Sequence, residues 1–319
     1  MNFLLTLNTT FIATFQIFAM GAVGFFLVRR KIMDGQGLSL ISTLLVNLFV
    51  PCFSFYQLTT NFSYAAYPNW WLFPLICWAM MLVGFILAWF MMIRNRAITS
   101  KREFMALVSF QNSGFIPLLL ITTMFPAAIA KTLYIYVFLF LIGFDMVIWS
   151  LGVWFLTRKR IEQFEIKSLL SAPFVAIVSS LIIVFFGINH YLPPSLMKPV
   201  KMIGDCMLPM AMIVVGGNLG VLNFSRLQLR ESGLVVFTKL IFLPLMTLCI
   251  LLYFKIGGLL GFFIMLESAM PSATSLSVIA RHYQIEEKLI SQGVFLTHIV
   301  SIITTPFFLT LYMQYSQLF

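Results

Sequence analysis

Charged side chains are scarce in this sequence. Asp, Glu, Lys and Arg together make up 9% of the 319 residues, whereas a soluble domain has roughly 25%. Hydrophobic residues account for 61% of the chain, and the mean hydropathy is +1.00. This composition excludes a soluble globular domain. It predicts an all-α membrane protein that crosses the bilayer many times.

The motifs of common enzymes are also lacking. The four cysteines, Cys52, Cys77, Cys206 and Cys249, lie in apolar runs without metal-ligand spacing, so we interpret them as core residues. No G-x-S-x-G, H-E-x-x-H or Gly-rich phosphate loop occurs, and the aspartates are not in the paired motifs of an intramembrane aspartyl protease. We therefore expect neither an enzyme nor an ATP-driven pump, and no cofactor or metal.

Ten apolar segments are present, each near the ~20 residues that cross the hydrocarbon core of a bilayer. They cover residues 9–28, 38–57, 70–93, 104–125, 131–156, 169–188, 198–222, 232–254, 258–280 and 289–312. No cleavable signal peptide is evident, because the first ten residues contain no basic region. The linkers are short, so we expect one membrane domain with ten transmembrane helices.

The basic residues are distributed unevenly among the linkers. One set of alternating linkers contains 15 of the 20 Lys and Arg residues. By the positive-inside rule this set faces the cytoplasm, which places both termini outside a cytoplasmic (inner) membrane. Basic loops without interleaved aromatic residues are typical topology signals that face anionic lipid. The net charge of +10 is thereby accounted for without nucleic acid as a partner.

The segment 258–280 is interrupted by Pro271. Proline has no N–H to donate, its ring clashes with the carbonyl group four residues earlier, and it favours an extended conformation at the preceding residue. We predict a helix that ends near Ser268 and a second helix that starts near Ser272. Unwound backbone at membrane depth is stable only where protein or a water-filled cavity covers it. The break is therefore a candidate ligand site.

Two pairs of landmarks suggest that the second half of the chain repeats the first. Segments two and seven contain N-L-F-V-P and D-C-M-L-P, which end at Pro51 and Pro209, and segments four and nine contain prolines at Pro117 and Pro271. A five-span unit followed by its copy must be inverted in the membrane. The alternative is that these prolines serve helix packing alone. The predicted division is a first repeat at 1–157, a cytoplasmic connector at 158–168 and a second repeat at 169–319.

Broken helices in segments four and nine would cross near the bilayer centre. Two helix N-termini would meet there, and their free N–H groups and dipoles favour an anion. The hydrogen-bonding side chains near the two breaks are Asn112, Ser113, Ser272, Thr274 and Ser275. A small carboxylate suits this set of groups.

Three stretches resemble the auxin efflux carrier family. They are F-Q-N-S-G-F-I-P-L-L-L from Phe110, A-M-P-S-A-T-S-L-S-V-I-A from Ala269 and G-V-F-L-T-H-I-V-S-I-I-T-T-P-F from Gly293. The resemblance covers nearly the whole chain. Bacterial members of that family lack a long central cytoplasmic loop, as this chain does, and resemble carriers of organic acids such as malate or malonate. The resemblance implies a dimerising scaffold of spans one, two, six and seven, with spans three to five and eight to ten as the mobile part.

The resemblance also implies which residues bind substrate. Carried over by position, these are Asn112, Ser113, Gly114, Pro117, Pro271, Ser272, Thr274 and Ser275. Two positions depart from the family's pattern, because Gln111 stands where a small residue is common and Ser275 where many relatives have Asn. These departures leave the identity of the substrate open.

Among Asp, Glu, Lys, Arg and His, five residues lie more than five positions inside the apolar segments: Asp145, Asp205, Lys239, Glu267 and His298. A charged side chain exposed to lipid costs at least ~2.5 kcal/mol at the bilayer centre, so each needs a partner or access to water. Glu267 adjoins the break in segment nine. It is expected either to carry a proton during transport or to form a structural pair with Lys239, for which Asp145 is the other possible partner. Asp145, Lys239 and His298 are the further candidates for proton or ion coupling. Asp205 is expected near the outer interface, and His298 is either a packing residue or a proton relay.

The sequence thus predicts a secondary transporter that moves a small organic anion by alternating access around a helix crossover. Its expected partners are that anion, the lipid bilayer and a second copy in a homodimer. One alternative is a cation/proton antiporter or a sodium-coupled transporter of the bile-acid type, which tends to have acidic residues beside the crossing. Segment four has none there, and segment nine has only Glu267. The second alternative is a membrane receptor or sensor that binds at the crossing without transport.

Overall fold

The computed structural model describes residues 3–95, 98–157, 170–221, 228–283 and 288–316. The described secondary structure is helical throughout, apart from a single β-bridge between Gln111 and Ser272. The predicted all-α class is therefore confirmed. The expected connector at 158–168 lies outside the described residues.

Seven helical spans in the described residues are long and apolar enough to cross a membrane. They are α1 (Phe3–Arg29); α2 (Gly35–Leu44), η1 (Leu45–Phe49) and α3 (Val50–Asn61); α4 (Leu72–Arg94); α7 (Ala127–Val147), η2 (Ile148–Gly152) and α8 (Val153–Thr157); α10 (Pro194–Asp205) and α11 (Met207–Val221); α12 (Leu229–Phe237), η6 (Thr238–Phe242) and α13 (Leu243–Tyr253); and α16 (Lys288–Tyr315). The shorter helices are α5 (Lys101–Ser109), α6 (Phe115–Met124), α9 (Ala172–Phe185), η5 (Ile188–Tyr191), α14 (Gly258–Ser268) and α15 (Ser275–His282).

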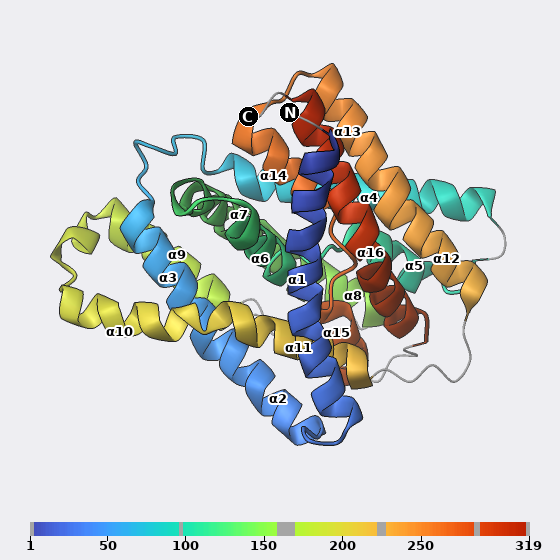
Figure 1. Cartoon of the computed structure of the whole chain (residues 1–319), viewed down its shortest axis with the longest axis horizontal. Coiled ribbons are helices and arrows are strands. Elements are labelled where there is room, and N and C mark those ends of the chain that lie inside the picture. Colours follow the sequence, from blue (N-terminus) through green and yellow to red (C-terminus); the bar gives the residue numbers. More distant parts are fainter. Residues whose placement is uncertain (1–2, 96–97, 158–169, 222–227, 284–287, 317–319) are drawn as a thin grey trace.

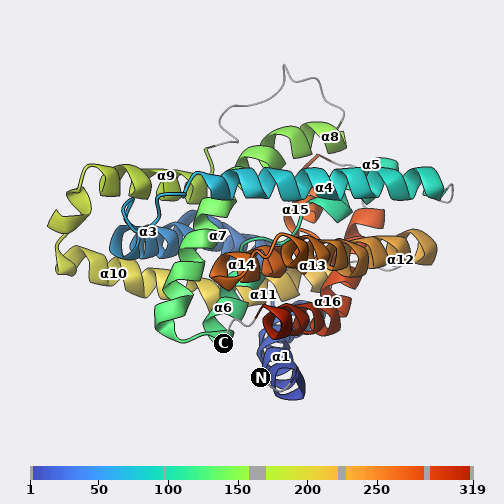
Figure 2. The ribbon, with the colours of Figure 1, turned by 90° about the horizontal axis from the view of Figure 1, so that it is seen from above.

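The helices form two groups that contact each other through α1, α6 and α7. In the first group α3 packs against α9 and α10, and α11 packs against α2 (Figure 1). In the second group α4 packs against α5 and α7, and α16 packs against α12, α14 and α15. α1 lies against both α11 and α16, as Figures 1 and 2 show. The start of α1 meets the end of α16, where the hydroxyls of Thr10 and Thr310 are 2.9 Å apart, so both chain ends lie on the same side.

Small residues allow α1 and α11 to approach closely. A Cβ atom at Gly216 would overlap the carbonyl group of Gly21, and one at Gly24 would overlap that of Ile213. Without a strong hydrophobic driving force between helices in lipid, close backbone packing of this kind stabilises their association. The glycines of segment seven are thus packing residues.

Prolines interrupt the regular hydrogen bonding of several helices. A π-helical turn, η1, precedes Pro51, and another, η6, precedes Pro244. α10 and α11 are separated at Cys206, three residues before Pro209. A proline removes one intrahelical bond and pushes away the carbonyl four residues earlier, which produces such bulges and breaks.

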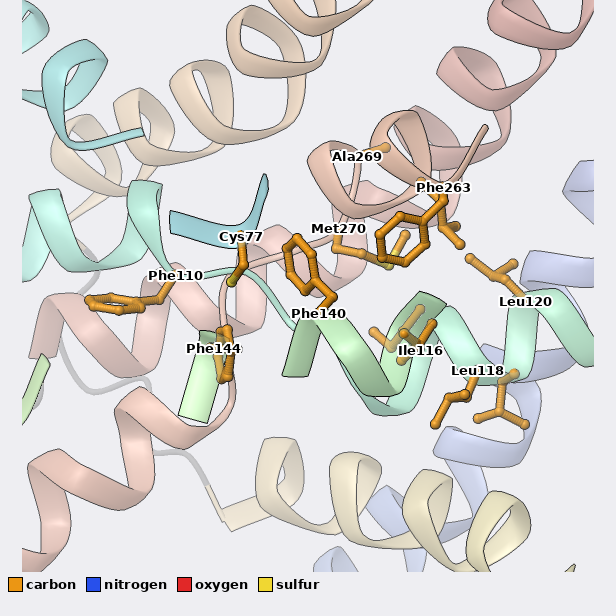
Figure 3. Close-up of a cluster of buried hydrophobic side chains, with 14 of the residues drawn as sticks. Cys77, Phe110, Ile116, Leu118, Leu120, Phe140, Phe144, Phe263, Ala269 and Met270 are labelled. Atoms are coloured by element: carbon orange, nitrogen blue, oxygen red, sulfur yellow. The ribbon is translucent and has the colours of Figure 1, made fainter. Parts of the chain in front are cut away.

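The outer surface is apolar, and the interior is packed around the interrupted segments. Large hydrophobic side chains of α4, including Trp78, Ile86 and Phe90, are exposed, as lipid-facing residues are. In the interior Phe110 and Met270 belong to the same cluster as Cys77 (Figure 3). The core therefore surrounds the two breaks described next.

Candidate functional site

The first break lies between α5 and α6. After α5 ends, Phe110 has an extended backbone (φ −95°, ψ 112°), and Gly114 is the N-cap residue of α6. Pro117 stands in the first turn of α6, where its missing N–H leaves no intrahelical bond unmade. A continuous helix would press its ring against the carbonyl of Ser113. No side chain caps the N-terminus of α6.

The second break lies between α14 and α15. α14 ends at Ser268, as predicted from Pro271, but α15 begins at Ser275, three residues later than predicted. The intervening backbone pairs with the first break: residues 110–112 run antiparallel to residues 271–273, with flanking N···O distances of 2.8 and 2.9 Å. This pairing satisfies backbone groups that would otherwise be free at membrane depth. The two interrupted segments therefore meet directly.

Hydrogen bonds from other helices hold the second break in place. The Ser272 hydroxyl donates to the Leu107 carbonyl at 2.7 Å, and the Ser272 N–H donates to the Thr297 hydroxyl at 3.2 Å. The Thr305 hydroxyl donates to the Ala269 carbonyl at 2.9 Å. Ser272 is fully buried, and its hydroxyl is used within the protein.

A cavity of about 180 Å³ adjoins the paired breaks. One water needs roughly 10–15 Å³ on this measure, so the cavity has room for a small organic molecule. The breaks contribute Gln111, Asn112, Ser113, Gly114, Phe115, Leu118, Ala273, Thr274 and Ser275 to its lining. The remaining lining residues are Val46, Val50, Leu141, Phe144, Asp145, Trp149, Ser171, Pro173 and Met207. Both helix groups thus contribute walls. Of the predicted site residues, Pro117, Pro271 and Ser272 are not in the lining.

Several features of the cavity favour a negatively charged group. The helices α6 and α15 begin at Phe115 and Ser275, which both line it, and helix N-termini attract anions. The amide nitrogen of Gln111 is buried and has no hydrogen-bond partner among the described residues. A buried donor without an acceptor costs about 1–3 kcal/mol, which a ligand oxygen would relieve. The sequence interpretation treated Gln111 only as a departure from the family pattern. The position of Gln111 next to Asn112 in the sequence was the signal that could have identified it as a site residue.

Asn112 is positioned by His298 of α16. Asn112 Nδ2 lies 3.4 Å from His298 Nε2, and His298 Nδ1 lies 2.7 Å from the carbonyl oxygen of Val294. Because a carbonyl only accepts, this arrangement puts the proton on Nδ1, and Nε2 accepts from Asn112. His298 is fully buried and does not line the cavity. The packing role that the sequence left open for it fits this geometry.

Asp145 is the one ionisable residue in the cavity lining. It is partly buried on α7, and the Ser171 hydroxyl donates to its Oδ2 at 3.3 Å. Ser171 is also the N-cap of α9, where its oxygen accepts from the Phe174 N–H at 3.2 Å. This contact joins α7 to the start of α9. In the described part of the chain Asp145 makes no ion pair with Lys239.

Lys239 and Glu267 are fully buried but are not in the cavity lining. Lys239 Nζ donates at 3.0 Å to the carbonyl of Val108 in the last turn of α5, where the helix dipole favours a cation. Both carboxylate oxygens of Glu267 lack a hydrogen-bond partner among the described residues. The Ser113 hydroxyl faces Glu267 but bonds the Gln111 carbonyl, at 3.5 Å. Lys239 and Glu267 interact electrostatically, yet they make no ion pair within 4.0 Å.

Asp205 lies away from these groups. It is exposed at the end of α10 and pairs with Lys201, at an N···O distance of 2.6 Å. This is the one ion pair among the residues that the structure describes.

Comparison with known proteins decides the class of this molecule. A family model described as membrane transport protein matches residues 9–170 and 156–309, nearly the whole chain. The chain belongs to the membrane transport protein family. The match confirms the resemblance to auxin efflux carriers, and it makes this protein a transporter rather than an enzyme.

One relative of this membrane transport protein is an uncharacterized transporter of Methanocaldococcus jannaschii. It is 26% identical over 136 residues, which are 41% of this chain and 42% of that protein. The match thus spans less than half of the relative's length. Membership of the family implies a membrane setting and a small transported molecule.

Proposed function

We propose that this protein is a secondary transporter that moves a small organic carboxylate across the cytoplasmic membrane by alternating access. The observation that carries this proposal is the unpartnered amide nitrogen of Gln111, in a cavity where two helices begin. A donor left without an acceptor beside two positive helix ends is a site prepared for an anionic oxygen.

In this proposal the carboxylate lies between the two breaks. On one side it accepts hydrogen bonds from the side chains of Gln111, Asn112 and Ser113, and on the other from Thr274 and Ser275 at the start of α15. Each charge-assisted bond contributes about 1.5–3 kcal/mol. Gly114 leaves the N-terminus of α6 uncovered. Pro117, Pro271 and Ser272 act indirectly, by keeping both helices interrupted and paired.

The arrangement of the helices supports alternating access. We propose ten membrane crossings, made by the seven long spans together with α5–α6, α9 and α14–α15, in two inverted repeats at 1–157 and 169–319. α1 to α3 and α9 to α11 are the scaffold, which dimerises, and the remaining helices move against it. Residues of both parts line the cavity. Movement of one part against the other can therefore open the cavity first to one side of the membrane and then to the other. Both termini are proposed to lie outside.

Binding measurements separate this proposal from a cation antiporter. Affinities of the purified protein are compared for a dicarboxylate, its monoamide and a monovalent cation. Asn112→Ala is expected to weaken dicarboxylate binding by about one to two orders of magnitude, because a charge-assisted bond is lost. Pro271→Ala is expected to weaken the binding of every carboxylate, because α14 can then continue past Ser268 and displace the start of α15.

The matched control is Asn61→Ala, since Asn61 bonds Gln57 within α3 and does not line the cavity. This variant should bind the dicarboxylate as the wild type does. Equal binding of acid and monoamide, with sodium or lithium competing against protons, would show that the site takes cations. A receptor or sensor would instead bind the acid without moving it across a membrane.

A further inference from the structure

The cavity combines groups that favour a negative ligand with one carboxylate of its own. Two helix N-termini and the Gln111 amide favour an anion, whereas Asp145 is negative when ionised. No Lys or Arg is among the lining residues. Two negative charges in a small, poorly hydrated space repel each other strongly. A bound carboxylate and an ionised Asp145 therefore disfavour each other.

Little in the surroundings of Asp145 compensates its charge. The hydrogen bond from Ser171, at 3.3 Å, is the one that the described residues provide. The titratable side chains on the helices packed against α7 are Cys77 and Arg94 of α4, Cys52 and Tyr56 of α3 and Glu267 of α14, while α6 and α9 have none. Of these, the Cys77 thiol is buried and its neutral form carries no charge. These neighbours supply no positive charge that pairs with Asp145 in the described residues.

We propose that Asp145 carries the proton that this transporter moves together with its substrate. The inference rests on the proposed function, because it requires an anion at the paired breaks. The Asp145 carboxylate takes one proton from the side on which the cavity is open, the carboxylate substrate binds, and both leave on the other side. Protonated Asp145 is neutral and has an O–H to donate. One monoanion with one proton carries no net charge, so the cycle is electroneutral.

The position of Asp145 distinguishes it from the other buried carboxyl group. Glu267 is fully buried and is not in the cavity lining, so substrate and solvent in the cavity do not reach it. Asp145 lines the cavity and contacts the N-cap of α9. A movement of α7 relative to α9 would therefore change the surroundings of this carboxyl group directly.

The test measures the affinity of a monocarboxylate as a function of pH, between about pH 6 and 9, where the ligand itself stays ionised. When binding requires one proton, wild-type affinity falls about tenfold for each pH unit above the point where Asp145 loses its proton in the free protein. Asp145→Asn should bind equally well at all these pH values. Asp205→Asn, a matched change of an exposed carboxylate outside the cavity, should behave as the wild type does.

Uptake into proteoliposomes supplies the second measurement. Wild-type uptake of the monocarboxylate should be driven by a pH gradient and unaffected by membrane potential, and Asp145→Asn uptake should respond to potential alone. If Asp145→Asn does not fold, the number of protons that the wild type takes up on binding the anion in weak buffer tests the same claim. About one proton per bound anion is expected, and binding without proton uptake would overturn the inference.

Other results would overturn the proposal in distinguishable ways. Unchanged pH dependence in folded Asp145→Asn would refute the role of Asp145 and leave the carboxylate site standing. A carboxylate with an amino group that binds more tightly than its deaminated analogue, only when Asp145 is present, would show that the side chain binds the ligand's ammonium group. Absence of carboxylate binding by the wild type at every pH would refute the proposed function itself.

Discussion

Replacing Gln111 by methionine should stabilise the free protein and weaken the binding of its substrate. Methionine has nearly the shape of glutamine but no amide group. The Gln111 nitrogen is buried without a partner among the described residues, so the wild type bears the cost of an unmade hydrogen bond. Removing that donor should raise the free energy of unfolding by about 1–3 kcal/mol.

The effect on binding has the opposite sign. In the complex the same nitrogen is proposed to donate to an anionic oxygen, and a hydrogen bond to a charged group contributes about 1.5–3 kcal/mol. Its loss corresponds to an affinity lower by roughly 10- to 150-fold. Few substitutions raise the stability of a free protein and also lower its affinity for a ligand. Finding both effects in Gln111→Met would therefore point to a donor that serves the ligand.

Thermal unfolding in detergent and titration with a carboxylate measure the two effects. Gln292→Met is the matched control, because Gln292 is equally buried but its Oε1 accepts hydrogen bonds from the Gln228 N–H and the Ser232 hydroxyl. This control should lower stability and leave affinity unchanged. A destabilised Gln111→Met protein with wild-type affinity would refute the reasoning, since the amide would then serve the fold and not the ligand.

Three further predictions concern packing, buried charge and topology. Gly216→Ala should lower the free energy of unfolding by about 1–3 kcal/mol or more, because a methyl group there overlaps the backbone of α1. Gly233→Ala is the control: this glycine has open space around it, so the substitution should not lower the free energy of unfolding in the same assay. Lys239→Met should lower the free energy of unfolding by about 1–3 kcal/mol, because the Val108 carbonyl at the end of α5 loses its hydrogen-bond donor. Adding Glu267→Gln should restore part of that loss, because the two buried groups interact electrostatically, and a double variant as unstable as the single variant would count against that interaction. A cysteine introduced at Gln163 should be labelled only from the cytoplasmic side, and labelling from outside in intact cells would contradict the ten-span arrangement.

The interruption of segment nine could be predicted from the sequence because it follows from covalent chemistry. Pro271 cannot donate a backbone hydrogen bond, and α14 ends at Ser268 as that fact requires. The start of α15 could not be predicted from local sequence. Residues 271–273 pair with residues 110–112, and this contact between Gln111 and Ser272, 161 positions apart in the chain, overrides the local tendency to restart a helix at Ser272.

The charged residues show the same limit. The buried charged groups could be located from the sequence, but Glu267 and Asp145 both remained possible partners of Lys239. In the structure Lys239 Nζ instead donates to the carbonyl of Val108 in the last turn of α5. Asp145 was named from the sequence as a candidate coupling residue and a possible partner of Lys239, but its place in the lining of the cavity was not predicted. Its placement depends on how α7 packs against the start of α9, which no pattern within α7 reveals.

Uptake of a labelled small carboxylate by proteoliposomes tests the central claim most directly. Vesicles with purified wild-type protein are compared with protein-free vesicles and with vesicles that contain Pro271→Ala. The account predicts uptake well above the protein-free level for the wild type, and uptake near that level for Pro271→Ala. The account would be contradicted if the folded wild-type protein took up no carboxylate but exchanged sodium or lithium for protons in the same vesicles.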